Sequence, residues 1–157
     1  MKILVATEKP FAKKAVDGIR QIVEGAGYEL ALLEKYTDKS ELLSAVADVD
    51  ALIIRSDKVT AEVIEAARNL KIVVRAGAGY DNVDLAAATA RGIVVMNTPG
   101  QNSNAVAELA LAMMIFMARK GFTPGTGSEI QGKTLGLPAY GNVGRLVGRQ
   151  GKAMGMN

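Results

Sequence analysis

Two arginines and one glycine-rich stretch are the residues whose types and spacing best suit the binding of an anion. The stretch is Arg75–Gly79 (RAGAG), whose small residues let consecutive backbone N–H groups approach a carboxylate or phosphate closely. Arg55 and Arg75 can add charge-assisted hydrogen bonds to the same anion. A tight strand-to-helix turn with solvated arginines explains the same residues, and the pattern alone favours that simpler interpretation.

A second glycine-rich stretch, Ala139–Gly144 (AYGNVG), is similar to the dinucleotide fingerprint G-x-G-x-x-G. Such glycines let a pyrophosphate reach the N-terminus of the following helix. Ala139 stands in place of the first glycine, and the acidic residue expected about twenty positions later is not in the sequence. Folding of this tail is disfavoured by Pro138, which stands at a strand end. It is also disfavoured by Gly148 and Gly151, each of which costs about 1 kcal/mol relative to alanine inside a helix.

Composition excludes several kinds of chemistry. The 157 residues include no cysteine and no histidine, which removes disulfides, thiolate nucleophiles and the usual general base and metal ligand. A net charge of +3, without a basic block, does not suit nucleic-acid binding. The longest apolar run, Leu109–Ala118, is too short to cross a bilayer, and the first residues lack a secretory signal. We therefore expect a cytoplasmic protein with no metal, nucleic-acid or membrane partner.

The elements that must position these residues alternate between strand and helix. Thr60 and Asp84 are predicted helix N-caps, and Pro10 is expected in the first turn of a helix. The first helical pattern includes Ile22 in its apolar stripe. Five short apolar runs predict buried parallel strands, at Lys2–Thr7, Glu29–Leu33, Ala51–Ile54, Lys71–Val74 and Ile93–Met96.

Strict alternation of this kind predicts an α/β fold with helices on both faces of the sheet. An eight-unit barrel would need about 250 residues, so we predict a doubly wound, flavodoxin-like, five-stranded parallel sheet. Ligands bind such sheets outside the carboxyl ends of the strands. Arg55-Ser56, Arg75–Gly79 and Asn97–Asn104 all follow predicted strands, although Asn97–Gly100 also consists of ordinary turn formers.

Three segments follow from this pattern: a flavodoxin-like domain over residues 1–100, a long helix over 101–120, and a linker with an incomplete β-α unit of a second sheet over 121–157. Asn102–Asn104 supply N-cap side chains for the helix, with Glu108 in its first turn. The helix is apolar nearly all round, so two domains or a second chain must cover it. Its methionines and phenylalanine suit packing better than a cofactor site. A further apolar strand is expected at Lys133–Leu137.

Three blocks of sequence together resemble the N-terminal part of the D-2-hydroxyacid dehydrogenase family, and most of all its D-3-phosphoglycerate dehydrogenases. They are Leu52–Thr60 (LIIRSDKVT), Val73–Met114 and Gly132–Arg145 (GKTLGLPAYGNVGR). The middle block is long and more specific than any glycine motif alone. In that family the first domain holds the substrate, the second holds NAD, and the active site lies between them.

The resemblance assigns roles to particular residues. It implies that Arg55, Arg75 and Asn102 bind the phosphate or other polar groups of the substrate. The backbone of Ala76, Gly77, Ala78 and Gly79 would receive the substrate carboxylate. The cofactor would meet Ala78 near its nicotinamide, and Gly141, Asn142, Val143 and Gly144 under its pyrophosphate.

No residue of this sequence matches the catalytic arginine, glutamate and histidine of the family, so no catalytic residue is assigned. Because histidine is absent, the acid–base partner for hydride transfer at a hydroxyl carbon is missing. We therefore expect a truncated or engineered fragment that supplies binding loops for a small anionic hydroxyacid such as 3-phosphoglycerate and is inactive alone. The alternative is an isolated structural domain without a catalytic role. In either case we expect a homodimer through the helix at 105–120.

Overall fold

Five short apolar segments pair in parallel in the order β2-β1-β3-β4-β5, as the computed structural model of residues 1–157 shows. The predicted five-stranded parallel sheet is therefore confirmed, with β4 and β5 beginning one residue later than expected. Each strand occupies four to six residues, a usual strand length. The expectation that all five are buried is wrong for β2 and β5, the edge strands, which bury no residue. The strands are β1 (Lys2–Thr7), β2 (Glu29–Glu34), β3 (Ala51–Ile54), β4 (Ile72–Arg75) and β5 (Val94–Asn97).

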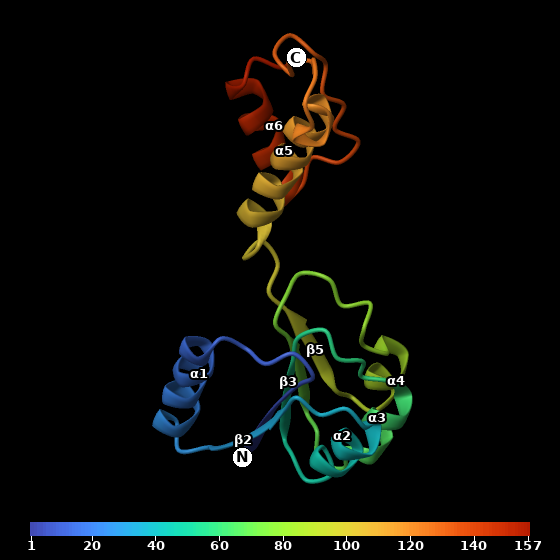
Figure 1. Cartoon of the computed structure of the whole chain (residues 1–157). Coiled ribbons are helices and arrows are strands. Elements are labelled where there is room, and N and C mark those ends of the chain that lie inside the picture. Colours follow the sequence, from blue (N-terminus) through green and yellow to red (C-terminus); the bar gives the residue numbers. More distant parts are fainter. The chain divides into compact units, whose positions relative to one another are not determined.

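Four helices connect these strands within the first of two compact units, Met1–Pro99. Figure 1 shows α1 on one side of the sheet and α2, α3 and α4 on the other. The main core lies against α2–α4 and includes Leu52, Ile54 and Ile64, all at most 1% exposed. Helix α1 buries only one residue, so the core is built mainly on one face. The helices are α1 (Lys13–Gly25), α2 (Lys39–Ala45), α3 (Ala61–Ala66) and α4 (Leu85–Ala90).

The helix ends confirm some of the predicted signals and correct others. Asp84 caps α4 by accepting a hydrogen bond from the Ala87 N–H at 2.9 Å. Thr60 occupies the N-cap position of α3, but its hydroxyl makes no capping bond. Pro10 precedes α1 instead of lying in its first turn, because the helix begins only at Lys13. Ile22 was expected in the apolar stripe, but it is 74% exposed because the sheet covers another face of α1.

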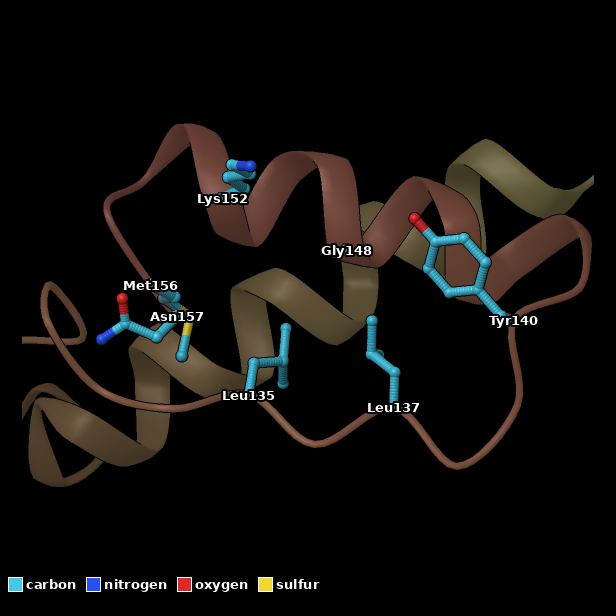
Figure 2. Close-up of a pocket in the computed structure, with 7 residues that line it drawn as sticks. All are labelled: Leu135, Leu137, Tyr140, Gly148, Lys152, Met156 and Asn157. Carbon is cyan, nitrogen blue, oxygen red and sulfur yellow. The ribbon is translucent and has the colours of Figure 1, made fainter.

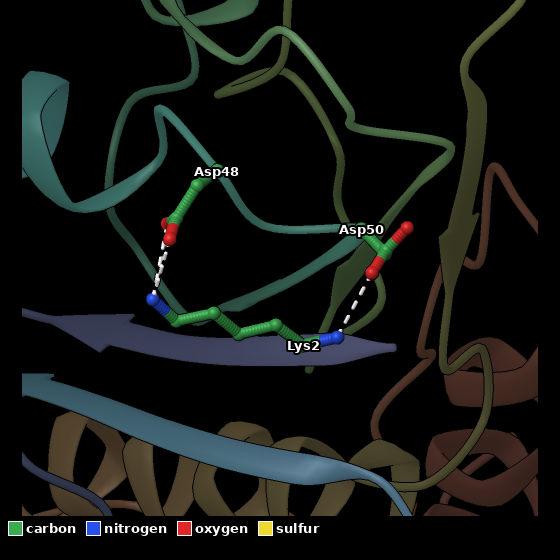
Figure 3. Close-up of polar contacts among 3 residues, drawn as sticks. All are labelled: Lys2, Asp48 and Asp50. Atoms are coloured by element: carbon green, nitrogen blue, oxygen red, sulfur yellow. Dashed lines mark hydrogen bonds and ion pairs between the residues drawn. The ribbon is translucent and has the colours of Figure 1, made fainter.

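Two aspartates fix the start of the interior strand β1 at the amino edge of the sheet (Figure 3). The Lys2 ammonium pairs with Asp48 at 2.9 Å, and the Lys2 backbone N–H donates to Asp50 at 2.9 Å. These hydrogen bonds favour the ionised acids and hold the pKa values of Asp48 and Asp50 below their usual values. The first strand is therefore tied to the segment that leads into β3.

The second compact unit, Gly100–Asn157, contains the long helix α5 (Ser103–Ala118), a short 3-10 turn that follows it, η1 (Lys120–Phe122), and the helix α6 (Asn142–Ala153). Helices α5 and α6 pack side by side (Figure 1). Asn102 stands at the N-cap of α5, but its side chain makes no capping bond because its ψ of 5° is not the extended geometry of a cap. The first turn of α5 contains no acidic residue, so the expected position of Glu108 was wrong. No helix is long and apolar enough to span a membrane.

The strand expected at Lys133–Leu137 does not form. A strand needs a backbone neighbour along its whole length to satisfy its polar groups, and here Asn157 is the only residue beyond a local turn that bonds to the backbone of this segment. The Leu135 N–H donates to the Asn157 carbonyl at 2.7 Å, and the Asn157 N–H donates to the Lys133 carbonyl at 2.9 Å. The segment is therefore extended but unpaired over most of its length.

The glycines of α6 allow it to pack closely on this extended segment. A Cβ at Gly148 would lie 2.9 Å from the Leu137 Cδ1 atom, and one at Gly151 would lie 2.9 Å from Leu135 Cδ2. A Cβ at Gly144 would overlap the Ala139 carbonyl oxygen, which is backbone and cannot move aside easily. The glycines expected to prevent folding of the tail are thus contact points, and the tail forms a helix.

Replacing Leu52 with alanine tests the core described above. Because Leu52 is fully buried in β3, we expect Leu52→Ala to lower the free energy of unfolding by about 2–5 kcal/mol. Urea denaturation followed by circular dichroism measures the change. The exposed Ile22 provides the control: Ile22→Ala should alter stability by no more than about 0.5 kcal/mol. Equal losses in the two variants would contradict this assignment of the core.

Replacing Gly144 with alanine tests the close contact between α6 and Ala139. The added methyl group would overlap the Ala139 carbonyl oxygen, so we expect Gly144→Ala to release α6 and expose its amide protons to hydrogen exchange. Gly141→Ala is the matched control, because a Cβ at Gly141 meets no atom within 4 Å. Protection of α6 that is unchanged in Gly144→Ala would show that the contact is unimportant.

Candidate functional site

The register of the sheet brings the predicted anion-binding residues of the first unit to one edge. Arg75, the last residue of β4, is paired with Ile54 of β3 on one side and with Asn97 of β5 on the other. Adjacent strands lie about 4.8 Å apart, so Arg55, which follows Ile54, begins the loop next to the glycine loop. The predicted clustering of these loops at the carboxyl edge is confirmed.

The backbone of the glycine loop is only partly free to bind an anion. The N–H groups of Ala76 and Gly77 donate to the carbonyls of Ile54 and Arg75, each at 2.8 Å. Those of Ala78 and Gly79 make no hydrogen bond within the chain. Of the four backbone N–H groups in Ala76–Gly79, only those of Ala78 and Gly79 are therefore free to bind an anion.

The end of β5 holds the glycine loop in place. The Asn97 side-chain amide donates to the Ala78 carbonyl at 2.7 Å, and the Thr98 N–H donates to the Gly77 carbonyl at 2.9 Å. Sequence reasoning placed Asn97 and Thr98 at this edge and interpreted them as turn formers, but it did not identify their hydrogen bonds to the glycine loop.

Arg75 lies folded over the glycine loop. A Cβ at Gly77 would overlap the Arg75 guanidinium, so only glycine leaves room for this arrangement. The Arg75 Nε atom is buried and has no hydrogen-bond acceptor in the chain. An unpartnered buried donor costs about 1–3 kcal/mol, and an anionic ligand at this position would supply the missing acceptor.

Asp57 and Tyr36 form a buried polar pair behind the Arg55 loop, and sequence reasoning identified neither. The Tyr36 hydroxyl donates to the Asp57 carboxylate at 2.8 Å, and the two residues are 6% and 4% exposed. Burial, followed by the hydrogen bond to Asp57 and the charge of Asp57, raises the pKa of Tyr36 above its ordinary value. Tyr36 therefore remains a neutral donor throughout the physiological pH range.

A crevice of about 450 Å³ lies at the same edge, beside the point where the strand order reverses between β1 and β3. Ligands of open α/β sheets bind at such points. Lys39 pairs with Glu62, whereas Lys58 makes no ion pair, so the crevice has mixed charge. Its lining residues are Glu8, Tyr36, Thr37, Lys39, Leu42, Ser56, Lys58 and Thr60.

The fingerprint residues Gly141–Gly144 stand at the start of α6 in the second unit. The N–H groups of Asn142, Val143 and Gly144 have no acceptor in the chain, and Gly144 provides the close approach to Ala139 that the third glycine of such a motif requires. These residues fit the pyrophosphate of a dinucleotide. Asn102 belongs to this second unit, whereas Arg55 and Arg75 belong to the first.

The second unit also contains a crevice of about 370 Å³ between α6 and the extended segment before it. Figure 2 shows Leu135, Leu137 and Tyr140 along that segment, facing Gly148 and Lys152 of α6. None of the four fingerprint residues lines this crevice. Nowhere in the chain do three or more acidic, histidine or cysteine side chains gather in a way that could hold a metal ion.

Comparisons with known proteins connect both sets of residues to one family. The sequence matches the D-isomer specific 2-hydroxyacid dehydrogenase, catalytic domain, over residues 4–148. It is 42% identical over 142 residues to a hydroxypyruvate reductase of Thermotoga maritima, covering 82% of this chain and 46% of that protein. It is 42% identical over 171 residues to a D-3-phosphoglycerate dehydrogenase of Archaeoglobus fulgidus, covering 100% of this chain and 31% of that protein.

A solved structure agrees with the sequence matches. The NAD+-bound 3-phosphoglycerate dehydrogenase of Entamoeba histolytica superimposes with a TM-score of 0.95 at 53% identity, covering 100% of this chain and 52% of that one. The present chain thus spans half or less of the length of the two curated relatives. With the match over residues 4–148, the chain belongs to the D-isomer specific 2-hydroxyacid dehydrogenase family.

Proposed function

We propose that this chain is the substrate-recognition part of an NAD-dependent 3-phosphoglycerate dehydrogenase. Residues 1–100 form the flavodoxin-like substrate-binding domain, and residues 101–120 form the helix between domains. Residues 121–157 form a linker and the incomplete beginning of the Rossmann domain. The family to which the chain belongs supports this proposal. So does the structural similarity of the chain to a 3-phosphoglycerate dehydrogenase with which it shares 53% sequence identity.

The unpartnered Nε atom of Arg75 is the observation that carries the assignment of substrate binding. In the proposed role Arg75 and Arg55 bind the anionic groups of the hydroxyacid. The free N–H groups of Ala78 and Gly79 receive its carboxylate, whereas those of Ala76 and Gly77 already donate to carbonyls of the chain. Asn102 contributes a further polar contact. Guanidinium and backbone N–H donors suit carboxylate and phosphate because both acceptors are charged.

The cofactor would be held at its pyrophosphate by Gly141, Asn142, Val143 and Gly144, with Ala78 near the nicotinamide. When bound, NAD accepts the hydride that leaves the hydroxyl carbon of the substrate. The chain has no histidine and contains no match to the catalytic arginine, glutamate and histidine of the family. We therefore propose that it recognises the hydroxyacid but does not oxidise it alone, and that it works in the cytoplasm.

Removing either arginine should weaken binding of 3-phosphoglycerate. Loss of a charge-assisted hydrogen bond costs about 1.5–3 kcal/mol, so we expect Arg55→Gln and Arg75→Gln each to raise Kd about tenfold or more. Titration of the ¹⁵N-labelled chain, followed by amide chemical shifts, measures millimolar affinities. Arg20→Gln is the control because Arg20 lies on α1 and pairs with Glu24.

Three results would contradict this function. The first is a wild-type chain whose amide shifts do not saturate with 3-phosphoglycerate. The second is an Arg20→Gln variant that loses as much affinity as the other two. The third concerns catalysis: NADH formation from 3-phosphoglycerate and NAD by the purified chain would show that the residues present suffice for the reaction.

The exposed apolar surface of α5 favours a second role, that of a structural domain which dimerises. Four large side chains on this helix are about half exposed or more: Leu109 at 61%, Met113 at 56%, Phe116 at 49% and Met117 at 75%. Contiguous exposed apolar surface of this kind marks an interaction site. We propose that a second copy of the chain covers α5, whether or not a ligand is bound.

Changing the exposed face of α5 should dissociate the dimer. Sedimentation velocity of the wild-type chain at micromolar concentration should give a dimer. Leu109→Glu with Met113→Glu should give a monomer, because charges on this face would be buried without partners. Ile22→Glu, at an equally exposed position on α1, should remain dimeric. A monomeric wild type, or a dimer unaffected by the double change, would refute the interface.

A further inference from the structure

Asp57 is an unusual residue in this unit because it is a buried carboxylate that pairs with no cation. It is 4% exposed, and none of the four ion pairs in the chain includes it. A buried charge without such a partner is costly unless several hydrogen bonds compensate for the lost water. The buried position of the Asp57 carboxylate therefore depends on the hydrogen-bond donors around it.

Three donors from three different strand ends reach this carboxylate. The Glu8 backbone N–H, just after β1, donates at 2.7 Å. The Tyr36 hydroxyl, just after β2, donates to the same oxygen, Oδ1, at 2.8 Å. The Arg55 backbone N–H, just after β3, donates to the other oxygen, Oδ2, at 3.3 Å. One side chain thus ties three neighbouring loops together.

The backbone of the same residue reaches a fourth loop. The Asn82 side-chain amide donates to the Asp57 carbonyl at 2.7 Å. Two residues further on, Val59 exchanges hydrogen bonds with the segment that follows the glycine loop, donating to Asn82 at 2.8 Å and accepting from Asp84 at 2.9 Å. Asp57 therefore connects the Arg55 loop to the loop after β4 as well.

We propose that Asp57 is a positioning residue, which holds Arg55 in the place where it meets the anionic substrate. This inference rests on the function proposed above, since it assumes that Arg55 binds the hydroxyacid. In this role Asp57, which is 4% exposed, does not contact the substrate itself. Its effect on affinity is transmitted entirely through the position of Arg55.

The change Asp57→Asn removes this positioning with little change in shape. If the amide oxygen keeps the bonds from Glu8 and Tyr36, the amide nitrogen must face the Arg55 N–H, and two donors then oppose each other. Tyr36→Phe is the complementary change because it removes one donor and leaves the bond to Arg55 intact. A purely structural role predicts that affinity falls in parallel with stability in both variants.

The test measures binding of 3-phosphoglycerate by amide chemical shifts and stability by urea denaturation, under conditions where every variant is folded. We expect Asp57→Asn to raise Kd about tenfold, within the range of coupling between neighbouring residues. Tyr36→Phe should lower stability but change Kd less than about twofold. Asp48→Asn is the matched control, since it removes an exposed carboxylate at the opposite edge of the sheet.

A double-mutant cycle isolates the route through Arg55. Once Arg55→Gln has removed the guanidinium, adding Asp57→Asn should change Kd less than about twofold, because there is no longer a group to position. Additive effects of the two changes would overturn the inference. So would an Asp57→Asn variant that binds as tightly as Asp48→Asn.

The outcomes separate this inference from the proposed function. A wild-type chain that does not bind 3-phosphoglycerate refutes both. A wild-type chain that binds, with Arg55→Gln weakened and Asp57→Asn unaffected, refutes only the role of Asp57.

Discussion

Parallel pairing of β3, β4 and β5 is the constraint on which the candidate site depends. Because all strands run in the same direction, each carries its following loop to the same edge. The register then aligns Ile54, Arg75 and Asn97 across three strands. A shift of one residue would turn every side chain to the other face of the sheet. The fully buried residues Leu52 and Val73, which are paired in this register, make such a shift costly.

Polar groups at that edge fix the positions of the loops through hydrogen bonds. Asn97 and Thr98 hold the glycine loop through its carbonyls, which leaves the Ala78 and Gly79 N–H groups free. Asp57 holds the Arg55 loop through its carboxylate. Donors fixed in this way lose little conformational freedom when a ligand binds, so more of the interaction energy contributes to affinity.

The two units contain different sets of candidate ligand-binding groups. The first unit contains arginines and backbone donors suited to an anion, and the second contains a helix start suited to a pyrophosphate. No histidine is present in either. Helix α5 is apolar on faces that the chain itself leaves exposed, and a helix of this composition requires further cover. The chain spans half or less of the length of two curated relatives.

The sequence by itself determined the class of fold, the five strands and the edge at which the arginines and glycines meet. It did so because buried parallel strands leave short apolar runs and because the carboxyl edge follows from strand direction alone. It was wrong about Lys133–Leu137, since an apolar run becomes a strand only where a neighbour satisfies its backbone. Only the tertiary structure decided the roles of Tyr36, Asp57 and Asn97, whose partners, apart from Arg55 beside Asp57, lie 19 to 49 residues away along the chain. Local pattern contains no information about contacts over such separations, because they exist only once the strands have paired.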